Sequence, residues 1–357
     1  MTVGPSLRSA LPRGPAAPYD FIPRLGDANA AAPPMMSDEE FFKPGREFDG
    51  FVLTAPLGAG GMGAVWKATH LKLRRPVAVK FMKREAAASD RSRARFLREG
   101  EAAARVRHPN VVEVFDVGVA NERTPYLVME LLDGEDLRAR FTRLGAMPVD
   151  ALVDLLLPVC AAVAAAHDEG VIHRDLKPEN IFVARTRDGV EVPKVLDFGI
   201  SHLDDDDGAH PSTSTSAVLG TPRHMSPEQV RGAGHVDARS DQYALGTVLY
   251  EGATGAAPFA AGSLFALMQR IVEGRFETPR ARRPALDADF EAVILRAMAV
   301  DADRRFSSVR ALGTALTQWL HGLDDMVDGA TLEELITRVA PRETTSVEGP
   351  RRGKEGG

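Results

Sequence analysis

Cysteine and long apolar runs are what this sequence has least of. Its 357 residues include one cysteine, Cys160, which excludes an internal disulfide and a cysteine metal cluster. Because Cys160 lies in an apolar run, we expect a buried thiol of the kind found in a reducing cytosol. No stretch supplies the roughly 20 uninterrupted apolar residues of a membrane span. The nearest, residues 151–166, contains Asp154 and Pro158, so no span is expected.

An excess of basic residues is also missing. The chain has 44 Lys and Arg against 50 Asp and Glu, a net charge of −6. The total charge therefore indicates neither a nucleic-acid partner nor an anionic membrane. Near the N-terminus, Arg8 and Arg13 are followed by prolines and not by an apolar stretch, so no signal peptide is expected. These features together predict a cytoplasmic protein.

The two ends of the chain differ in composition from its middle. Residues 1–47 hold eight prolines, many alanines and no periodic pattern, which predicts a disordered tail. In the C-terminal tail, 321–357, Thr331 and Glu334 have the spacing of a capping box for one short helix. The end of that tail is rich in Arg, Glu and Gly and is expected to be disordered.

The middle of the chain, residues 48–320, changes from β-rich to helical at about residue 130. Residues 48–130 are predicted to form a small sheet carrying one helix, from β-rich runs at 51–65, 77–81, 111–119 and 125–130 and a helical stretch at about 89–107. Residues 131–320 are predicted to be mainly helical, with patterns at 149–167, 240–253, 263–273, 289–299 and 308–320 around a polar stretch at 171–229. The fold class is therefore α+β with two lobes, and a ligand site is expected where they join.

A glycine-rich run joins two of the β-rich segments. It reads Gly58, Ala59, Gly60, Gly61, Met62, Gly63, Ala64, Val65. Glycine lets the backbone approach phosphates closely and present its N–H donors. Glycine-rich turns are common, so the run alone is weak evidence. A dinucleotide-binding fold would place a helix after the glycines, whereas residues 65–68 are β-rich, which disfavours that alternative.

Lys80 ends a strand pattern, Val77-Ala78-Val79, seventeen residues after Gly63. A lysine at a strand end can simply face solvent, but downstream of the glycine run it is the group expected to hold the phosphates of ATP. A cation in a cleft needs a partner. Glu99 on the following helix is the expected partner, and Glu101 is the competing choice because Gly100 loosens the helix between them.

The strongest pattern is His173-Arg174-Asp175-Leu176-Lys177-Pro178-Glu179-Asn180, followed by Asp197-Phe198-Gly199. Phosphoryl transfer needs an oriented hydroxyl and cations that neutralise charge on the phosphates. Asp175 can orient the hydroxyl and accept its proton, and Lys177 can reach the transferred group. Asn180 and Asp197 offer the oxygen ligands that Mg²⁺ prefers. Singly these residues are also turn formers, but their ordered combination is specific.

In this order the motifs resemble the eukaryotic-type (Hanks-type) serine/threonine protein kinase family of bacteria over residues 49–320. The resemblance extends through the segment 220–228 to Asp241 and Arg305. It implies the two-lobed protein kinase fold, with ATP and Mg²⁺, or Mn²⁺, as cofactors. Asp241 would brace the catalytic loop from beneath, and Arg305 would pair with Glu228.

The resemblance also implies a role for each matching site residue. The catalytic residues would be Asp175, Lys177, Lys80 and Glu99, and the metal ligands Asn180 and Asp197. The nucleotide would contact Leu57, Gly58, Ala59, Gly60, Gly61, Met62, Gly63, Ala64, Val65, Ala78, Lys80, Met129, Glu130 and Leu132. Within this set, the backbone of Glu130 and Leu132 would meet adenine, with Met129 behind it.

Three residues depart from what such domains contain. His224 and Ser226 stand where the family usually has Tyr and Ala, in the wall that receives the substrate peptide, so altered substrate docking is expected. Gly100 costs about 1 kcal/mol in a helix interior relative to Ala. The helix that carries Glu99 is therefore expected to be more mobile than usual.

Residues 201–219 combine four consecutive aspartates, 204–207, with five consecutive hydroxyl residues, 212–216. One interpretation is a solvated, flexible loop. The other is an activation loop ordered by autophosphorylation at Thr213, Ser214, Thr215 or Thr221, with Arg174 clamping the phosphate. The neighbouring acids disfavour added negative charge.

Protein substrates with serine or threonine acceptors are the expected partners, together with the chain itself. Serine/threonine preference is argued from Lys177 and Thr221, which the resemblance places beside the acceptor hydroxyl. A pseudokinase would have lost part of the set Lys80, Asp175, Asn180 and Asp197, which is retained here. A small-molecule phosphotransferase would lack the segment 177–179 and the segment 221–228. A homodimer through the small lobe is common in the family.

Overall fold

The computed structural model describes residues 42–59, 63–121, 123–198, 222–232 and 236–322. Several residues singled out from the sequence lie outside this part of the chain: Gly60, Gly61 and Met62 of the glycine run, Gly199, Thr213, Ser214, Thr215, Thr221, Thr331 and Glu334. The expectations of a disordered start and end, of a C-terminal helix and of a phosphorylated activation loop therefore remain predictions.

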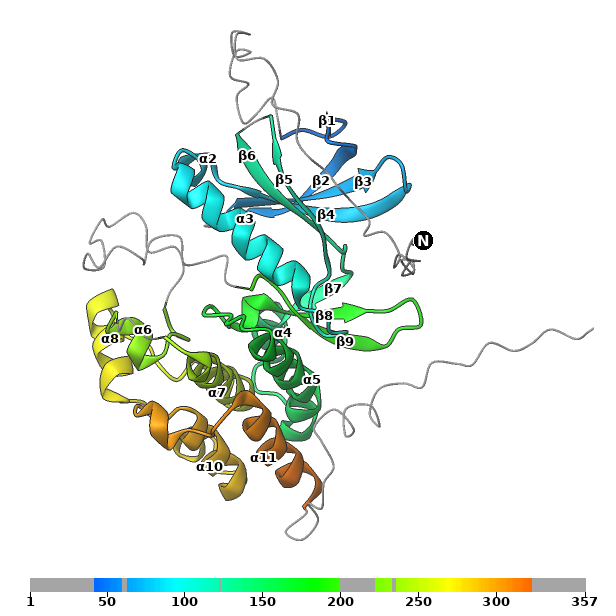
Figure 1. Ribbon diagram of the computed structural model, residues 1–357. Helices are drawn as coiled ribbons and strands as arrows, with labels where there is room; N and C mark the ends of the chain where they lie inside the picture. The colour runs from blue at the N-terminus through cyan, green and yellow to red at the C-terminus, as the bar shows by residue number, and fades with distance from the viewer. Residues whose placement is uncertain (1–41, 60–62, 122, 199–221, 233–235, 323–357) are drawn as a thin grey trace, which may run out of the picture. The chain divides into compact units, whose positions relative to one another are not determined.

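The N-terminal lobe is built on a six-stranded antiparallel sheet (Figure 1). Its spatial order is β1 (Glu47–Phe48), β2 (Phe51–Ala59), β3 (Gly63–His70), β4 (Arg75–Met82), β6 (Thr124–Met129) and β5 (Val114–Ala120). The central strand β4 is buried over residues 77–82, because Ala78 and Met82 pack in one cluster with Phe96 of helix α3 (Asp90–Arg105) and aromatic rings pack around Phe81. This burial turns Lys80 inward, with 5% of its surface exposed.

Gly63 begins β3 at the end of the glycine run and lies opposite Met82 of β4. A Cβ atom at this position would lie 1.8 Å from the carbonyl oxygen of Phe81. Only glycine lets the two strands approach this closely. Gly63 therefore anchors the C-terminal side of the glycine run onto the strand that carries Lys80.

The helix on the sheet, α3 (Asp90–Arg105), follows the short helix α2 (Arg84–Ala87). It begins at Ser89, whose side chain accepts a hydrogen bond from the backbone N–H of Ser92. Gly100 is buried where α3 meets the sheet, and a Cβ there would lie 2.3 Å from Cδ2 of Leu127 and 3.3 Å from Cγ2 of Val117. Gly100 thus allows the helix to pack closely on the sheet, a role that was not visible in the sequence.

Residues 42–47, which the sequence places in the N-terminal tail, pack on this lobe. The ring of Phe42 lies 5.1 Å from that of Phe81 and 6.3 Å from that of Trp66. The backbone N–H of Gly45 donates to the carbonyl of Leu53. The expectation of a disordered tail is therefore wrong for residues 42–47.

The C-terminal lobe is mainly helical. Its elements are β7 (Gly134–Asp136), α4 (Leu137–Leu144), α5 (Val149–Asp168), η1 (Pro178–Asn180), β8 (Ile181–Arg185), β9 (Glu191–Val195), α6 (Pro227–Val230), α7 (Ala238–Thr254), α8 (Leu264–Glu273), α9 (Pro279–Arg282), α10 (Ala288–Ala297), η2 (Ala302–Arg304) and α11 (Val309–His321). Helices α5 and α7 are central and in contact, with α11 packed on both. Strands β7, β8 and β9 form a small antiparallel sheet beside the join of the lobes.

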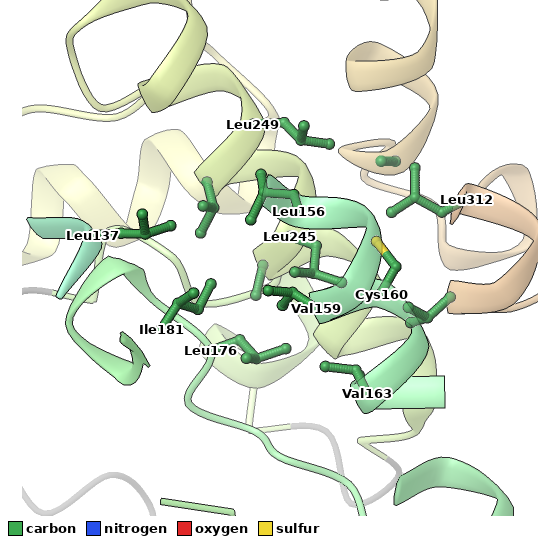
Figure 2. Packing of buried hydrophobic residues seen from close by; sticks show 14 of the residues in the cluster. Leu137, Leu156, Val159, Cys160, Val163, Leu176, Ile181, Leu245, Leu249 and Leu312 are labelled. Atoms are coloured by element: carbon green, nitrogen blue, oxygen red, sulfur yellow. The ribbon is translucent and has the colours of Figure 1, made fainter. Parts of the chain in front are cut away.

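Helix α5 supplies much of the core of this lobe. Figure 2 shows its Leu156, Val159 and Val163 among side chains of α7, α11 and the segment 176–181. Cys160 lies in the same cluster, and its burial raises the pKa of the thiol to about 12, so the buried thiol expected from the sequence is confirmed. By length and composition α5 could cross a membrane, but 61% of its apolar window is buried within the protein, as in the core helix of a globular domain.

Candidate active site

A buried carboxylate supports the loop that contains Asp175. Asp241, near the start of α7, accepts hydrogen bonds of 2.8 Å from the backbone N–H groups of His173 and Arg174. Its Oδ2 also lies 2.7 Å from Nε2 of His167 on α5. Asp241 is completely buried, so these contacts replace its hydration. The expectation that Asp241 braces this loop is confirmed.

Two residues of the site have left-handed backbone conformations. The φ angles are 64° at Arg174 and 55° at Asp197. Such conformations cost about 1–3 kcal/mol in residues other than glycine and persist where the surroundings hold them. Arg174 is held on both sides, because its N–H donates to Asp241 and its carbonyl accepts from Nε2 of Gln229. These contacts fix the backbone directly before Asp175 and thereby orient the Asp175 side chain.

The carboxylate of Asp175 contacts the ammonium group of Lys177 and the side-chain amide of Asn180. Lys177 Nζ is 2.7 Å from its Oδ2, and Asn180 Nδ2 donates to its backbone carbonyl at 2.7 Å and to Oδ2 at 3.2 Å. The loop can make these contacts because η1 starts at Pro178, whose missing N–H costs nothing in the first turn. Asp175, Lys177 and Asn180 therefore come together as the sequence predicted.

Lys80 and Asp197 connect the two lobes. Lys80 Nζ lies 2.8 Å from Asp197 Oδ1. The backbone N–H of Leu196 donates to the carbonyl of Asn180 at 2.9 Å, which places Asp197 next to the Asp175 loop. A continuous series of contacts thus joins Lys80, Asp197, Asn180 and Asp175.

The expected ion pair between Lys80 and Glu99 is wrong for the conformation described here. Lys80 contacts Asp197, whereas Glu99 Oε1 accepts a 2.9 Å hydrogen bond from Nε of Arg95. Arg95 and Glu99 are four residues apart on α3, a spacing that favours an ion pair within the helix. Glu101, the competing choice, is exposed.

An apolar surface lies beside Lys80 at the join of the lobes. Val65, Ala78, Met129, Leu132 and Leu196 belong to one cluster of packed side chains. The first four were expected from the sequence to contact a nucleotide. Leu196, directly before Asp197, packs in the same cluster and was not expected there from the sequence.

Backbone hydrogen bonds and strand pairing fix Glu130 and the start of the glycine run. Glu130 donates its N–H to the carbonyl of Glu113 at 3.0 Å, so its own carbonyl is the backbone group that can meet a ligand. Leu57, Gly58 and Ala59 are exposed on the strand that enters the glycine run. Gly58 and Ala59 pair in register with the next strand, at Val65 and Ala64.

The donor set near Asp197 fits a hard divalent cation. Asn180 uses its Nδ2 on Asp175, so its side-chain oxygen is the atom suited to a cation. Asp197 supplies a carboxylate. In the described residues no three His, Cys, Asp or Glu side chains gather as a metal cage. Magnesium commonly takes one or two such protein ligands and completes its shell with phosphates and water.

His224 and Ser226 are buried, which corrects the expectation that they line a peptide-facing wall. Ser226 caps α6: its hydroxyl accepts from the N–H of Gln229, and the Gln229 side chain accepts from the N–H of Ser226. Nδ1 of His224 lies 2.7 Å from Oγ1 of Thr247 on α7. Both side chains therefore serve packing and hydrogen bonding inside the lobe, where a peptide cannot contact them directly.

His224 is expected to make the domain sensitive to mild acid. Burial lowers its pKa from 6.5 to about 4. Between these values the unfolded chain binds a proton that the folded chain does not, so stability falls as pH drops from 6.5 towards 4. The shift of about 2.5 pKa units corresponds to a contribution of about 3–4 kcal/mol, at about 1.4 kcal/mol per unit.

The measurement is urea unfolding of the wild type and of His224→Gln from pH 7 to pH 4.5. The wild type will lose more stability than the variant over this range. His321→Gln, which changes an exposed histidine, will keep the wild-type slope. Equal slopes for the wild type and His224→Gln would show that His224 does not stay neutral.

Glu228 and Arg305 form the ion pair that the sequence predicted. Two parallel hydrogen bonds of 2.8 Å join Nη1 and Nη2 of Arg305 to the two carboxylate oxygens. Burial alone would raise the pKa of Glu228, but hydrogen bonds from Arg305 and Ser240 outweigh it and lower the pKa to about 2. The pair ties α6, next to the candidate site, to the base of the helical lobe.

Comparison with known proteins is consistent with this geometry. Residues 51–317 match the family model described as protein kinase domain. The chain is 38% identical over 282 residues to the serine/threonine-protein kinase PknB of Mycobacterium tuberculosis, covering 78% of this chain and 44% of that protein. It is 41% identical over 268 residues to the serine/threonine-protein kinase Pkn1 of Myxococcus xanthus, covering 74% and 38% respectively. The chain thus spans less than half the length of these relatives.

A solved structure of a similar chain has the same fold. The crystal structure of the PknI kinase domain of M. tuberculosis aligns with a TM-score of 0.63 and 29% sequence identity. The alignment covers 79% of this chain and 99% of that one.

Proposed function

This chain belongs to the protein kinase domain family, and from that premise we propose that it transfers the γ-phosphoryl group of ATP to serine or threonine hydroxyls of proteins. The observation that carries the proposal is the series of contacts joining Lys80, Asp197, Asn180 and Asp175. It brings the Lys80 cation, two side chains with oxygens suited to a metal and the Asp175 carboxylate to one place between the lobes. These are the groups on which phosphoryl transfer depends.

Each of these groups has a defined task in the proposed reaction. Asp175 orients the acceptor hydroxyl and takes its proton as the oxygen bonds to the γ-phosphorus, while the bond from that phosphorus to the β–γ bridging oxygen breaks and ADP leaves. Lys177, 2.7 Å from Asp175, stabilises charge on the transferred group. Asn180 and Asp197 would hold a divalent cation, which neutralises phosphate charge when bound. We propose that this cation is Mg²⁺ and that Mn²⁺ can replace it, since both prefer oxygen ligands.

The charge pairs must exchange before transfer. Asp197 contacts Lys80 directly here, whereas transfer requires Asp197 to face the metal and Lys80 to face the phosphates. Glu99 would then leave Arg95 and support Lys80.

Further parts of the proposal concern domain bounds, regulation, location and partners. We assign the catalytic domain to residues 48–320, divided between the lobes at 130 and 131. Autophosphorylation at Thr213, Ser214 or Thr215 would act through Arg174, whose place beside Asp175 suits a phosphate clamp. A cytoplasmic location fits the need for ATP. Protein substrates and a second copy of the chain are the proposed partners.

The test is incubation of the purified chain with γ-labelled ATP, a generic acceptor protein and Mg²⁺, Mn²⁺ or EDTA. Label will appear on serine or threonine of protein with either metal and will be lost with EDTA. Label on small metabolites alone would identify a small-molecule phosphotransferase. ATP binding without any transfer would identify a pseudokinase.

A further inference from the structure

The side chain of Gln229 joins α6 to the loop that contains Asp175. Its Nε2 donates a 2.7 Å hydrogen bond to the backbone carbonyl of Arg174, 55 residues earlier in the chain. Its Oε1 accepts from the backbone N–H of Ser226 at 3.0 Å and from the hydroxyl of the same residue at 3.1 Å. Both ends of one amide are therefore in use, one on the loop and the other at the start of α6.

The direction of this amide is set by its partners. Arg174 offers a carbonyl oxygen, which can only accept, and Ser226 offers a backbone N–H, which can only donate. If the Gln229 amide were turned by a half rotation, oxygen would face oxygen and N–H would face N–H. The position therefore calls for a side chain of this length with a donor and an acceptor side by side, and glutamine supplies both.

The carbonyl that Gln229 holds belongs to the peptide bond between Arg174 and Asp175. A peptide bond is planar, so holding its oxygen also fixes the N–H of Asp175, which lies 3.2 Å from Nδ1 of His173. The φ angle of 64° at Arg174 is a conformation that persists only where the surroundings enforce it. Gln229 therefore helps to hold the backbone from which the proposed base projects.

Helix α6 is a rigid support for this contact. Glu228, the residue before Gln229, accepts two hydrogen bonds of 2.8 Å from Arg305 and one of 2.7 Å from the hydroxyl of Ser240. Pro227 at the start of the helix restricts its backbone further. Because α6 is tied to the base of the helical lobe, the Gln229 amide connects the catalytic loop to that base.

Capping of α6 does not account for the whole contact. In a capping box the third helical residue accepts a hydrogen bond from the N-cap N–H, and glutamate does this as well as glutamine. Capping by Gln229 therefore uses Oε1 alone. The hydrogen bond from Nε2 to Arg174 needs a second role, and substitution can separate the two roles.

We propose that Gln229 is a positioning residue for the catalytic base: through the carbonyl of Arg174, its amide holds the Asp175 carboxylate in the direction that phosphoryl transfer requires. This inference rests on the proposed protein kinase function. Its consequence is kinetic, because a displacement of about 1 Å in a catalytic group can slow a reaction by about 100-fold. The loss of one hydrogen bond beside solvent costs little stability by comparison.

The experiment uses Gln229→Glu, which keeps the length of the side chain and an oxygen for the cap but replaces the donor to Arg174 by a charged oxygen. With a serine peptide, kcat will fall about 10- to 100-fold. The KM for ATP and the midpoint of urea unfolding will stay close to the wild-type values, because the cap is kept. Gln229→Met, which is uncharged and also lacks the donor, will lower kcat to a similar degree.

Two control variants separate positioning from capping. Ser226→Ala removes the capping hydroxyl but keeps the backbone N–H on which the Gln229 amide rests. It will lower the midpoint of urea unfolding, as the loss of a cap does, and leave kcat within about twofold of the wild type. Gln269→Glu makes the same chemical change as Gln229→Glu at an exposed position of α8 and will leave kcat at the wild-type value.

Three results would overturn the inference. The first is a wild-type kcat in both folded Gln229 variants. The second is a fall in kcat for Gln229→Glu alone, which would assign the effect to the new charge. The third is a fall in kcat for Ser226→Ala as large as that for Gln229→Glu, which would make capping of α6 the cause. By contrast, a wild type that phosphorylates no peptide or protein contradicts the proposed function itself.

Discussion

Asp175→Asn will lower phosphoryl transfer to protein by about 100- to 10,000-fold, the usual contribution of a general base. Asparagine keeps the shape of the side chain and an oxygen that can accept from Nδ2 of Asn180. It has no basic carboxylate to take the proton of the hydroxyl or to pair with Lys177. The fold should be retained, because the loop is held through the backbone of His173 and Arg174.

The measurement is kcat with a serine peptide, together with thermal unfolding and ATP binding. Asp188→Asn makes the same chemical change at an exposed position between β8 and β9 and will leave kcat at the wild-type value. Unchanged transfer in Asp175→Asn would show that this carboxylate is not the base and that the proposed mechanism is wrong. A fall in kcat with intact ATP binding supports it.

Arg305→Met will destabilise the domain by about 3–5 kcal/mol, the cost of leaving one partner of a buried ion pair alone. The side chain of Arg305 is fully buried and that of Glu228 is 16% exposed. The guanidinium also donates to the carbonyls of Ala299 at 2.9 Å and Arg239 at 2.7 Å. The change would therefore leave a carboxylate and two backbone carbonyls without this donor.

Urea unfolding measures the effect, and two variants define it. Arg305→Met with Glu228→Gln will be more stable than Arg305→Met by at least about 1 kcal/mol, because no lone charge remains. Arg310→Met removes an arginine from a solvent-exposed pair with Asp168 and will cost less than about 1 kcal/mol. A cost for Arg305→Met as small as that for Arg310→Met would mean that the Glu228 pair does not tie α6 to the lobe.

The elements that the sequence predicted best are those with a strong pattern. The amphipathic or apolar stretches at 149–167, 240–253 and 308–320 correspond to α5, α7 and α11 within a few residues. Burial of a continuous face enforces such patterns. Strands β7, β8 and β9 were missed because they have three to five residues and mix polar with apolar side chains. Only their pairing in space makes them strands.

The candidate site also has contacts that the sequence predicted and contacts that it did not. Asp175, Lys177 and Asn180 are within six residues of one another, and local contacts bring them together. The partner of Lys80 was predicted wrongly, because carboxylates at 99, 101 and 197 are chemically alike and differ only in where the fold places them. The contact of Gln229 gave no sequence signal, since its partner Arg174 lies 55 residues away in the chain.

The sequence by itself determined the two-lobed kinase fold, the order of its strong elements and the chemistry of the catalytic loop, because periodic burial and short loops are encoded by neighbouring residues. The tertiary structure decided which charges meet, that His224 and Ser226 lie inside, and that Gly100 is a packing position on the sheet. The physical reason is that pairing energies of like groups are similar in water, so the choice among partners depends on distances and burial that only packing sets.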